Sequence, residues 1–454
     1  MKEPSVRRPL SRARSAVVRL PSGATLHAEP SSAERFPAVL TWSVLLAALL
    51  LFGQSFYYLH ELTLPYFLSK AWPIVTLPLT LYALLYMRLP ARLFYLVFLT
   101  YAIGLTPIIS MVQLGNGLVD AMITTVKVWP LTYFFGLSAL LLWLRPSYQR
   151  TRMALIVLGV ATYGLMLGLW LLVPDPWYTS DPALGKLFMS DIERGFRIYM
   201  PMFFGTLLVF YMVRSFMQRP HWLPILGVVV SFIMLLTIYK QRTAIGAMLV
   251  VALYGIVISL PLRLRRIVIG LSLLTVPLAL GYTFVVNSQD LAESLGGSLT
   301  VWQTSLALAA NYLGDNPWRW LFGVGATTRF GSITLSDIFG NSQFYIADLG
   351  WLGVVFEYGL MGALLLAGLY VWGFFTVLRV TDEPRDPMML ALSDYILFML
   401  ISSAVYSLVF TPGELGVVMA VAVYLHRQRS TPSAISNPAH SISFAPAPRY
   451  SNRT

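Results

Sequence analysis

Three arginines stand where guanidinium groups could bind an anion at the surface of a membrane. Arg242 lies in the very short gap between two apolar segments, and Arg194 and Arg197 lie three residues apart, just before another. A helix that began there would carry both on one face. Guanidinium groups bind phosphate oxygens in pairs, a geometry that a lysine ammonium lacks. These positions predict a clamp for a diphosphate, with Lys240 as an additional cation.

Each of these cations also has a structural interpretation, which stays open at the level of sequence. Asp191 and Glu193 lie beside Arg194 and Arg197 and could form a local salt-bridge cluster with them. Lys240 could extend its flexible side chain to the lipid headgroups. The small residues that follow this lysine and its arginine neighbour would let a ligand or another helix come close.

Two further arginines, Arg319 and Arg329, bracket the glycine-rich run Phe322-Gly323-Val324-Gly325. Such a loop can bring backbone N–H groups close to an anion. The run has no strand–helix frame and no Gly-Lys-Ser after it, so it is neither a dinucleotide-binding nor a P-loop motif. It predicts either part of an anion site or a plain surface loop.

The acidic residues near the end of the chain offer candidates for a general base. Asp337 or Asp348 could accept a proton from a hydroxyl nucleophile, although Asp348 could equally cap the helix that follows it. Glu357 lies well inside an apolar segment, where a carboxylate must be protonated or paired with an arginine. Lys127 is also inside an apolar segment and could pair with an acid on another helix or line a cavity.

Composition predicts a single polytopic membrane domain. Hydrophobic residues make up 57% of the 454 residues and charged residues only 11%, about half the charge of a soluble domain. The chain has no cysteine, which excludes disulfides, thiolate metal sites and cysteine nucleophiles. Its five histidines are scattered, so we expect no metal site and no cofactor.

Twelve apolar segments of roughly the length of a bilayer crossing follow one another along the chain. We therefore expect an all-α polytopic membrane protein with about twelve transmembrane helices. The segments are 36–58, 71–87, 93–112, 121–144, 153–173, 198–213, 223–238, 243–261, 267–287, 349–375, 389–410 and 414–425.

The basic residues predict how these segments are oriented. Of the 32 lysines and arginines, 23 lie in the two tails and in every second gap. Because positive charge accumulates on the cytoplasmic side, both termini are expected in the cytoplasm. The net charge of +12 is explained by this distribution, and it indicates membrane lipids rather than nucleic acid as partners.

The same pattern predicts the domain boundaries. Residues 1–35 are expected to form a disordered basic arm, residues 36–425 the transmembrane domain, and residues 426–454 a disordered tail. The gap 288–348 is long enough for a subdomain outside the membrane. Within it, 291–313 has the apolar spacing of a helix, and the turn-rich run 314–317 ends that helix.

Four features of the sequence occur in a characteristic order. Residues 242–247 (Arg-Thr-Ala-Ile-Gly-Ala) open a helix, and Arg194 or Arg197 precedes an earlier one. A Leu-Phe-Gly-Val-Gly run, 321–325, lies in the long outer loop, and the returning segment 348–362 contains Asp-Leu-Gly-Trp-Leu and Phe-Glu-Tyr-Gly-Leu-Met-Gly. This pattern resembles the superfamily of O-antigen polymerases and O-antigen ligases (Wzy/WaaL-like), including the polymerases of xanthan-type exopolysaccharides.

The resemblance implies an inverting, metal-independent glycosyltransferase with a membrane-embedded fold of the C type. Its donors would be polyprenyl-diphosphate-linked oligosaccharides at the periplasmic face of the bacterial inner membrane. By position, Arg194, Arg197 and Arg242 would hold the diphosphate and assist its departure. Ligases of this group usually carry a histidine near the end of the large loop, and 288–348 contains none. This departure favours a polymerase.

The expected activity is therefore the transfer of a growing lipid-linked glycan onto another lipid-linked repeat unit. Asp348 or Asp337 would assist the acceptor hydroxyl, and several aromatic side chains would offer faces for sugar rings. These aromatic residues are Trp318, Trp320, Tyr345 and Trp351. Two alternatives remain: a ligase that delivers the glycan to lipid A core or another acceptor, and a flippase or transporter of lipid-linked oligosaccharides. A chain-length regulator and export machinery are possible partners of a polymerase.

Overall fold

The structure is a computed structural model, and it describes residues 36–181, 185–191, 194–286, 297–326, 339, 346–381, 386–406 and 412–430. The predicted basic arm and residues 431–454 of the predicted tail lie outside this part. Residues 426–430, which the sequence assigned to the tail, instead complete the last helix, α19 (Pro412–Ser430).

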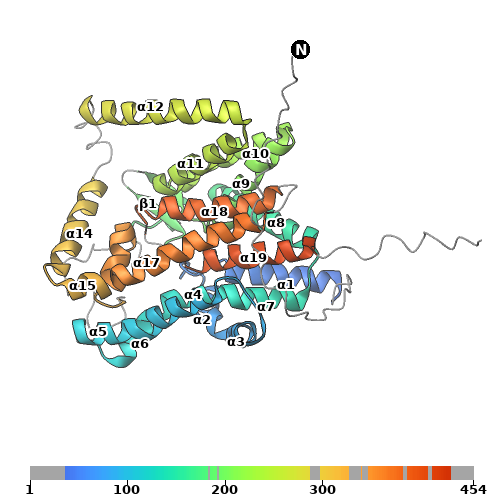
Figure 1. Cartoon of the computed structure of the whole chain (residues 1–454). Helices are drawn as coiled ribbons and strands as arrows, with labels where there is room; N and C mark the ends of the chain where they lie inside the picture. Colours follow the sequence, from blue (N-terminus) through green and yellow to red (C-terminus); the bar gives the residue numbers. More distant parts are fainter. Residues whose placement is uncertain are drawn as a thin grey trace, which may run out of the picture. The chain divides into compact units, whose positions relative to one another are not determined.

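Each of the twelve predicted apolar segments overlaps at least one helix (Figure 1). In chain order the helices are α1 (Ala38–Phe52), α2 (Thr63–Val75) with α3 (Leu77–Tyr86), α4 (Arg92–Leu99) with η1 (Thr100–Leu105) and α5 (Thr106–Leu114), α6 (Leu118–Thr124) with η2 (Thr125–Thr132) and α7 (Tyr133–Leu144), α8 (Tyr148–Leu172), α9 (Phe203–Gln218), α10 (Trp222–Met234) with η4 (Leu235–Tyr239), α11 (Arg242–Ser259), α12 (Leu262–Val286), α17 (Gly350–Arg379), α18 (Pro387–Ser402) and α19.

Length and composition identify a helical membrane protein. In the described part, seven helical stretches are long and apolar enough to cross a bilayer, and the apolar helices α1, α9 and α18 are shorter. Seven of the twelve predicted crossings are therefore supported by helix length and composition, and the other five remain a prediction. The seven stretches are Thr63–Tyr86, Arg92–Leu114, Leu118–Leu144, Tyr148–Leu172, Trp222–Tyr239, Arg242–Ser259 and Gly350–Arg379.

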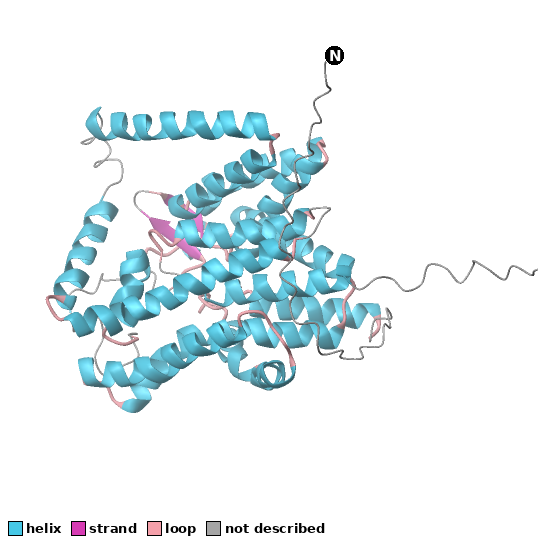
Figure 2. Cartoon of the chain, viewed as in Figure 1, coloured by secondary structure: helices cyan, strands magenta, loops and turns pink. Residues whose placement is uncertain are grey.

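One short sheet departs from the all-α expectation. Strands β1 (Phe188–Asp191) and β2 (Gly195–Ile198) pair in antiparallel register, with Met189 opposite Arg197 (Figure 2). The glycine that begins β2 has φ 66°, a left-handed conformation that glycine adopts without strain. The expectation that Arg194 and Arg197 share a helix face is therefore wrong, because α9 begins only at Phe203.

The predicted loop helix is present as α14 (Gly297–Leu313), and residues 288–296 of the long gap lie outside the described part. As predicted, the helix ends at Gly314, which has φ 53° and donates its N–H to Ala310. The side chain of Asn316 then accepts a hydrogen bond from Trp318 N and caps the short helix α15 (Pro317–Phe322).

The glycine-rich run after α15 crosses α17 where that helix is broken at Gly359 (φ 65°, ψ 179°). Val324 N donates to Phe356 O at 2.8 Å, and Gly325 N donates to Glu357 O at 3.1 Å. The N–H groups of Val324 and Gly325 are thus used inside the protein. The run is neither an anion loop nor a plain surface loop, because the interrupted helix leaves carbonyls that need donors.

The helices that carry the candidate site pack around α9. This helix contacts α8, α10, α11 and α18, while α19 packs along α7. In a bilayer, helices associate through close packing because the lipid is as apolar as they are. Gly159 of α8 illustrates this: a Cβ there would lie 2.8 Å from the carbonyl oxygen of Phe204 on α9. Such contacts fix the position of α9, and with it the strands just before it.

Candidate anion-binding cavity

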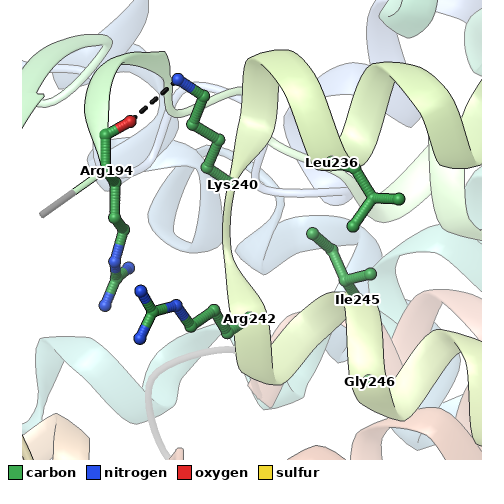
Figure 3. Close-up of a pocket in the computed structure, with 6 residues that line it drawn as sticks. All are labelled: Arg194, Leu236, Lys240, Arg242, Ile245 and Gly246. Atoms are coloured by element: carbon green, nitrogen blue, oxygen red, sulfur yellow. Dashed lines mark hydrogen bonds between the residues drawn. The ribbon is translucent and has the colours of Figure 1, made fainter. Parts of the chain in front are cut away.

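The structure brings two of the predicted arginines to one open cavity with a volume of about 470 Å³. Figure 3 shows the guanidinium groups of Arg194 and Arg242 directed into the same space. The apolar side chains of the cavity come from η4 and the first turns of α11. The lining residues are Arg194, Leu236, Lys240, Arg242, Ile245 and Gly246.

Arg242 is the first residue of α11 and the most available cation of the cavity. It is exposed and has no hydrogen bond or ion pair with any residue that the structure describes. The backbone N–H groups at a helix N-terminus add partial positive charge beside it. One turn on, a Cβ placed on Gly246 would meet nothing within 4 Å. This end of α11 therefore combines a free guanidinium with room for a ligand.

Arg194 and Arg197 reach the site from the turn and strand of the hairpin. Arg194 Nε lies 3.8 Å from Asp191 Oδ2, and Arg197 Nη2 lies 3.7 Å from the same oxygen. The salt-bridge cluster that the sequence offered as an alternative is thus present with Asp191, while Glu193 is outside the described residues. Both separations exceed a hydrogen bond, and two cations share one carboxylate. The described members of the cluster, two arginines and one aspartate, therefore carry a net positive charge.

Arg197 is not among the residues that line the cavity, but it shares Asp191 with Arg194. It is only 8% exposed, and its Nε and Nη1 atoms have no hydrogen-bond partner among the described atoms. Burial, reinforced by the neighbouring Arg194, lowers the pKa of Arg197, and Asp191 opposes this shift. An anion nearby would stabilise the charged form of this arginine. The three arginines therefore divide into two that line the cavity and one that is buried and linked to Arg194 through Asp191.

Lys240 contributes its aliphatic stem to the cavity, but its ammonium is engaged elsewhere. Nζ donates to the carbonyl oxygens of Arg194 at 2.8 Å and of Phe196 at 2.9 Å. The alternative from the sequence was that Lys240 extends to the lipid headgroups. Both of these bonds instead go to backbone carbonyls of the hairpin. The hairpin carbonyls take two of the three donors of the ammonium, and the predicted role as an anion ligand remains a prediction for the third.

The other predicted anion ligands lie away from this cavity or outside the described residues. Arg319 is on α15, where Nη1 donates to Tyr312 O at 2.8 Å and Nε donates to Gln113 Oε1 at 3.2 Å. Its guanidinium carbon also lies 4.9 Å from the ring centroid of Tyr312. Arg319 thus holds α15 and α14 to α5. Arg329 is not among the described residues.

The predicted sugar-stacking residues do not form one group. Trp318 is exposed and stacks on Phe322 at 5.8 Å, beside a second, apolar cavity of about 290 Å³. Trp320 Nε1 donates to Gly314 O at 2.8 Å, and Trp351 Nε1 donates to Ser403 Oγ at 2.9 Å. Tyr345 lies outside the described residues. Among the three of these residues that the structure describes, Trp318 is the exposed one.

The described part of the chain does not include the side chains of the two candidate bases. Asp337 lies outside it, and for Asp348 the backbone is described, within η5 (Ile346–Leu349), but the side chain is not. The alternative that Asp348 caps the following helix stays a prediction, because its side chain is not described. Leu349 occupies the cap position of α17, without a side-chain hydrogen bond.

Two buried ion pairs account for charges inside apolar segments. Lys127 Nζ hydrogen-bonds Glu357 Oε1, so a lysine is one partner of Glu357. Arg214 forms a two-pronged contact with Asp394, with both N–O distances 2.6 Å. Arg214 is one of the 23 cations assigned to the tails and gaps, and this pair was not predicted. The sequence feature that could have predicted the pair is Asp394, an acid inside another apolar segment, where a charged side chain needs a partner.

No group of three or more histidine, aspartate or glutamate side chains suited to a metal ion occurs among the described residues. No family model matches the chain, and a search of curated proteins finds no match.

Proposed function

We propose that this protein is a polysaccharide polymerase of the inner membrane of a bacterium. It transfers a glycan from a polyprenyl diphosphate onto a lipid-linked repeat unit at the periplasmic face, as an inverting glycosyltransferase of the C type without a metal. The proposal includes twelve membrane crossings with both termini in the cytoplasm, which places the gap before α11 and the β1–β2 hairpin on the periplasmic side.

One observation carries the proposal: Arg194 and Arg242 face the same open cavity from two segments far apart in sequence. Arg242 has no acidic partner among the described residues, and Arg194 and Arg197 share Asp191 at distances beyond a hydrogen bond. The cavity is also bounded by Leu236 and Ile245. A ligand with an anionic head and a hydrocarbon chain suits both the arginines and the apolar side chains of this cavity.

The chemistry needs little from the protein beyond positioning and charge. The acceptor hydroxyl oxygen attacks the anomeric carbon from the face opposite the diphosphate, and the carbon–oxygen bond to the diphosphate breaks as the new glycosidic bond forms. Arg242, Arg194 and Arg197 stabilise the negative charge that develops on the leaving diphosphate. Asp348 or Asp337 accepts the proton of the hydroxyl group.

Replacement of Arg242 by alanine tests this proposal in cells. The Arg242→Ala strain is expected to lose long polymer and to accumulate lipid-linked single repeats, while the protein still inserts at normal level. Arg263→Ala is the matched control, because Arg263 is an exposed arginine at the first turn of another helix, α12. Polymer of normal length and amount in the Arg242→Ala strain would refute the diphosphate role.

A second candidate is a flippase for the same lipid-linked oligosaccharide. It is favoured by the break in α17 at Gly359 beside the buried Lys127–Glu357 pair, because transporters often place interrupted helices and buried charge at their substrate path. The leaflet in which single repeats accumulate after gene loss separates the two. Accumulation in the periplasmic leaflet supports the polymerase, and accumulation in the cytoplasmic leaflet supports the flippase.

A further inference from the structure

Lys240 connects the two segments that carry the cavity arginines, the β1–β2 hairpin with Arg194 and the helix α11 with Arg242. It follows the π-helical segment η4 and precedes α11, whose first residue is Arg242. Its own backbone is left-handed, with φ 55°, and its N–H closes the preceding turn on Leu235 O at 2.8 Å. A non-glycine residue in this conformation is uncommon, which is a reason to look for a role of its side chain.

The ammonium of Lys240 joins the helix turn to the hairpin. Its two hydrogen bonds, to Arg194 O and Phe196 O, span 46 and 44 residues of sequence. The acceptors flank Gly195, the glycine whose φ of 66° turns the chain into β2. Figure 3 shows this ammonium directed at the backbone of Arg194, while the two guanidinium groups extend into the cavity.

We infer that Lys240 is a positioning residue that clamps the hairpin bearing Arg194 to the helix bearing Arg242, and that it thereby fixes the spacing of the two guanidinium groups. A diphosphate can contact both arginines only when that spacing matches its two phosphoryl groups, whereas a monophosphate needs only one of them. The clamp follows from the contacts alone; its consequence for a diphosphate ligand rests on the proposed function.

Two variants remove the clamp in different ways. Lys240→Met keeps the apolar stem and loses the donors. Lys240→Gly loses the side chain but suits the left-handed backbone, so its turn is expected to fold at least as well as the wild-type turn. Lys240→Arg keeps a long cationic donor and is expected to restore much of the clamp. Because the chain has no cysteine, spin labels can be placed on Phe196→Cys in the hairpin and Leu253→Cys on α11, both exposed positions.

The experiment combines two readouts on the full-length protein in lipid nanodiscs. The first is the spin-label distance distribution between positions 196 and 253. The second is the ratio of affinities for geranylgeranyl diphosphate and geranylgeranyl monophosphate. The clamp predicts a broader distance distribution and at least a fivefold fall in the affinity ratio for Lys240→Met and Lys240→Gly, with both readouts largely restored in Lys240→Arg.

Other outcomes overturn the inference. An unchanged distance distribution in both Lys240→Met and Lys240→Gly would show that the lysine does not hold the hairpin. An unchanged distribution with weaker binding of both lipids would make it a direct anion ligand. If Arg194→Ala and Arg242→Ala bind the diphosphate as well as wild type, the proposed function fails, while the distance distribution still decides whether the clamp exists.

Discussion

The arginine cavity and the Lys127–Glu357 pair are two regions where cations stand at or inside apolar segments, and they differ in what surrounds the charge. Lys127 is buried against a carboxylate, and the pair lies where the glycine-rich run crosses the broken α17. Arg242 is exposed at an open cavity without an acidic partner among the described residues. A paired buried cation is explained by the fold, whereas an unpaired one at a cavity is explained by a ligand.

The largest effect is expected from splitting the buried pair. Glu357→Leu or Lys127→Met alone removes one partner of a buried ion pair, which costs about 3–5 kcal/mol of unfolding free energy. The double variant removes both charges and should recover most of that loss. Thermal unfolding of the detergent-solubilised protein measures the effect, with Arg242→Met as the control expected to change the unfolding free energy by less than about 0.5 kcal/mol. Single variants as stable as wild type would remove the contrast between the two regions.

Replacing an arginine of the cavity should affect binding without affecting the fold. A hydrogen bond to a charged group is worth about 1.5–3 kcal/mol, so Arg194→Ala and Arg242→Ala should each weaken the affinity for an isoprenoid diphosphate roughly 10- to 150-fold. Arg242→Lys should recover only part of this, because an ammonium lacks the planar pair of donors. Isothermal titration in nanodiscs measures it. Full affinity in Arg242→Lys would mean that charge alone is recognised.

Two glycines, Gly359 at the break in α17 and Gly246 at the arginine cavity, allow a steric test of the difference between the two regions. A Cβ on Gly359 would lie 2.3 Å from Leu321 O, in a backbone with φ 65°, so Gly359→Ala should lower the stability by about 1–3 kcal/mol. Gly246 faces open space, so Gly246→Ala should be neutral or slightly stabilising. Gly246→Leu should reduce polymer length by narrowing the cavity while the melting temperature stays near that of wild type. Normal polymer in Gly246→Leu would argue against a ligand in this cavity.

The smallest effect is expected at Asp191, which partly neutralises Arg194 and Arg197. Asp191→Asn removes a contact that is partly exposed, so stability should change by less than about 1 kcal/mol. Because the acid competes with an external anion, diphosphate affinity should rise about two- to fivefold, since part of an exposed charge pair of about 0.5–1 kcal/mol is released. Binding titrations at low ionic strength measure the change. A loss of affinity would instead assign Asp191 a role in holding the arginines in place.

Much of the fold could be predicted because it depends on local composition. Each predicted apolar segment overlaps at least one helix, and Gly314 ends the loop helix as expected. The hairpin was missed because strands of four residues carry little periodic signal, and its glycine turn was interpreted as the approach to a helix. The partner of Glu357 lies 230 residues away in sequence, and no local pattern indicates such a distance.

The candidate site was predicted only in part, for a similar reason. Residue type and position identified Arg194 and Arg242, because a cation at a membrane turn needs an explanation. The same argument predicted Lys240 and Arg319 as anion ligands, yet their donors contact backbone carbonyls and Gln113. Sequence shows which donors exist, and the tertiary structure decides which of them remain free.

The most direct test of the central claim is a cryo-electron microscopy structure of the protein in a nanodisc with a polyprenyl-diphosphate-linked oligosaccharide. The account predicts phosphate density between the guanidinium groups of Arg194 and Arg242, with the lipid chain leaving past Leu236 and Ile245. Density for the diphosphate at another part of the protein, with the arginine cavity empty, would contradict it.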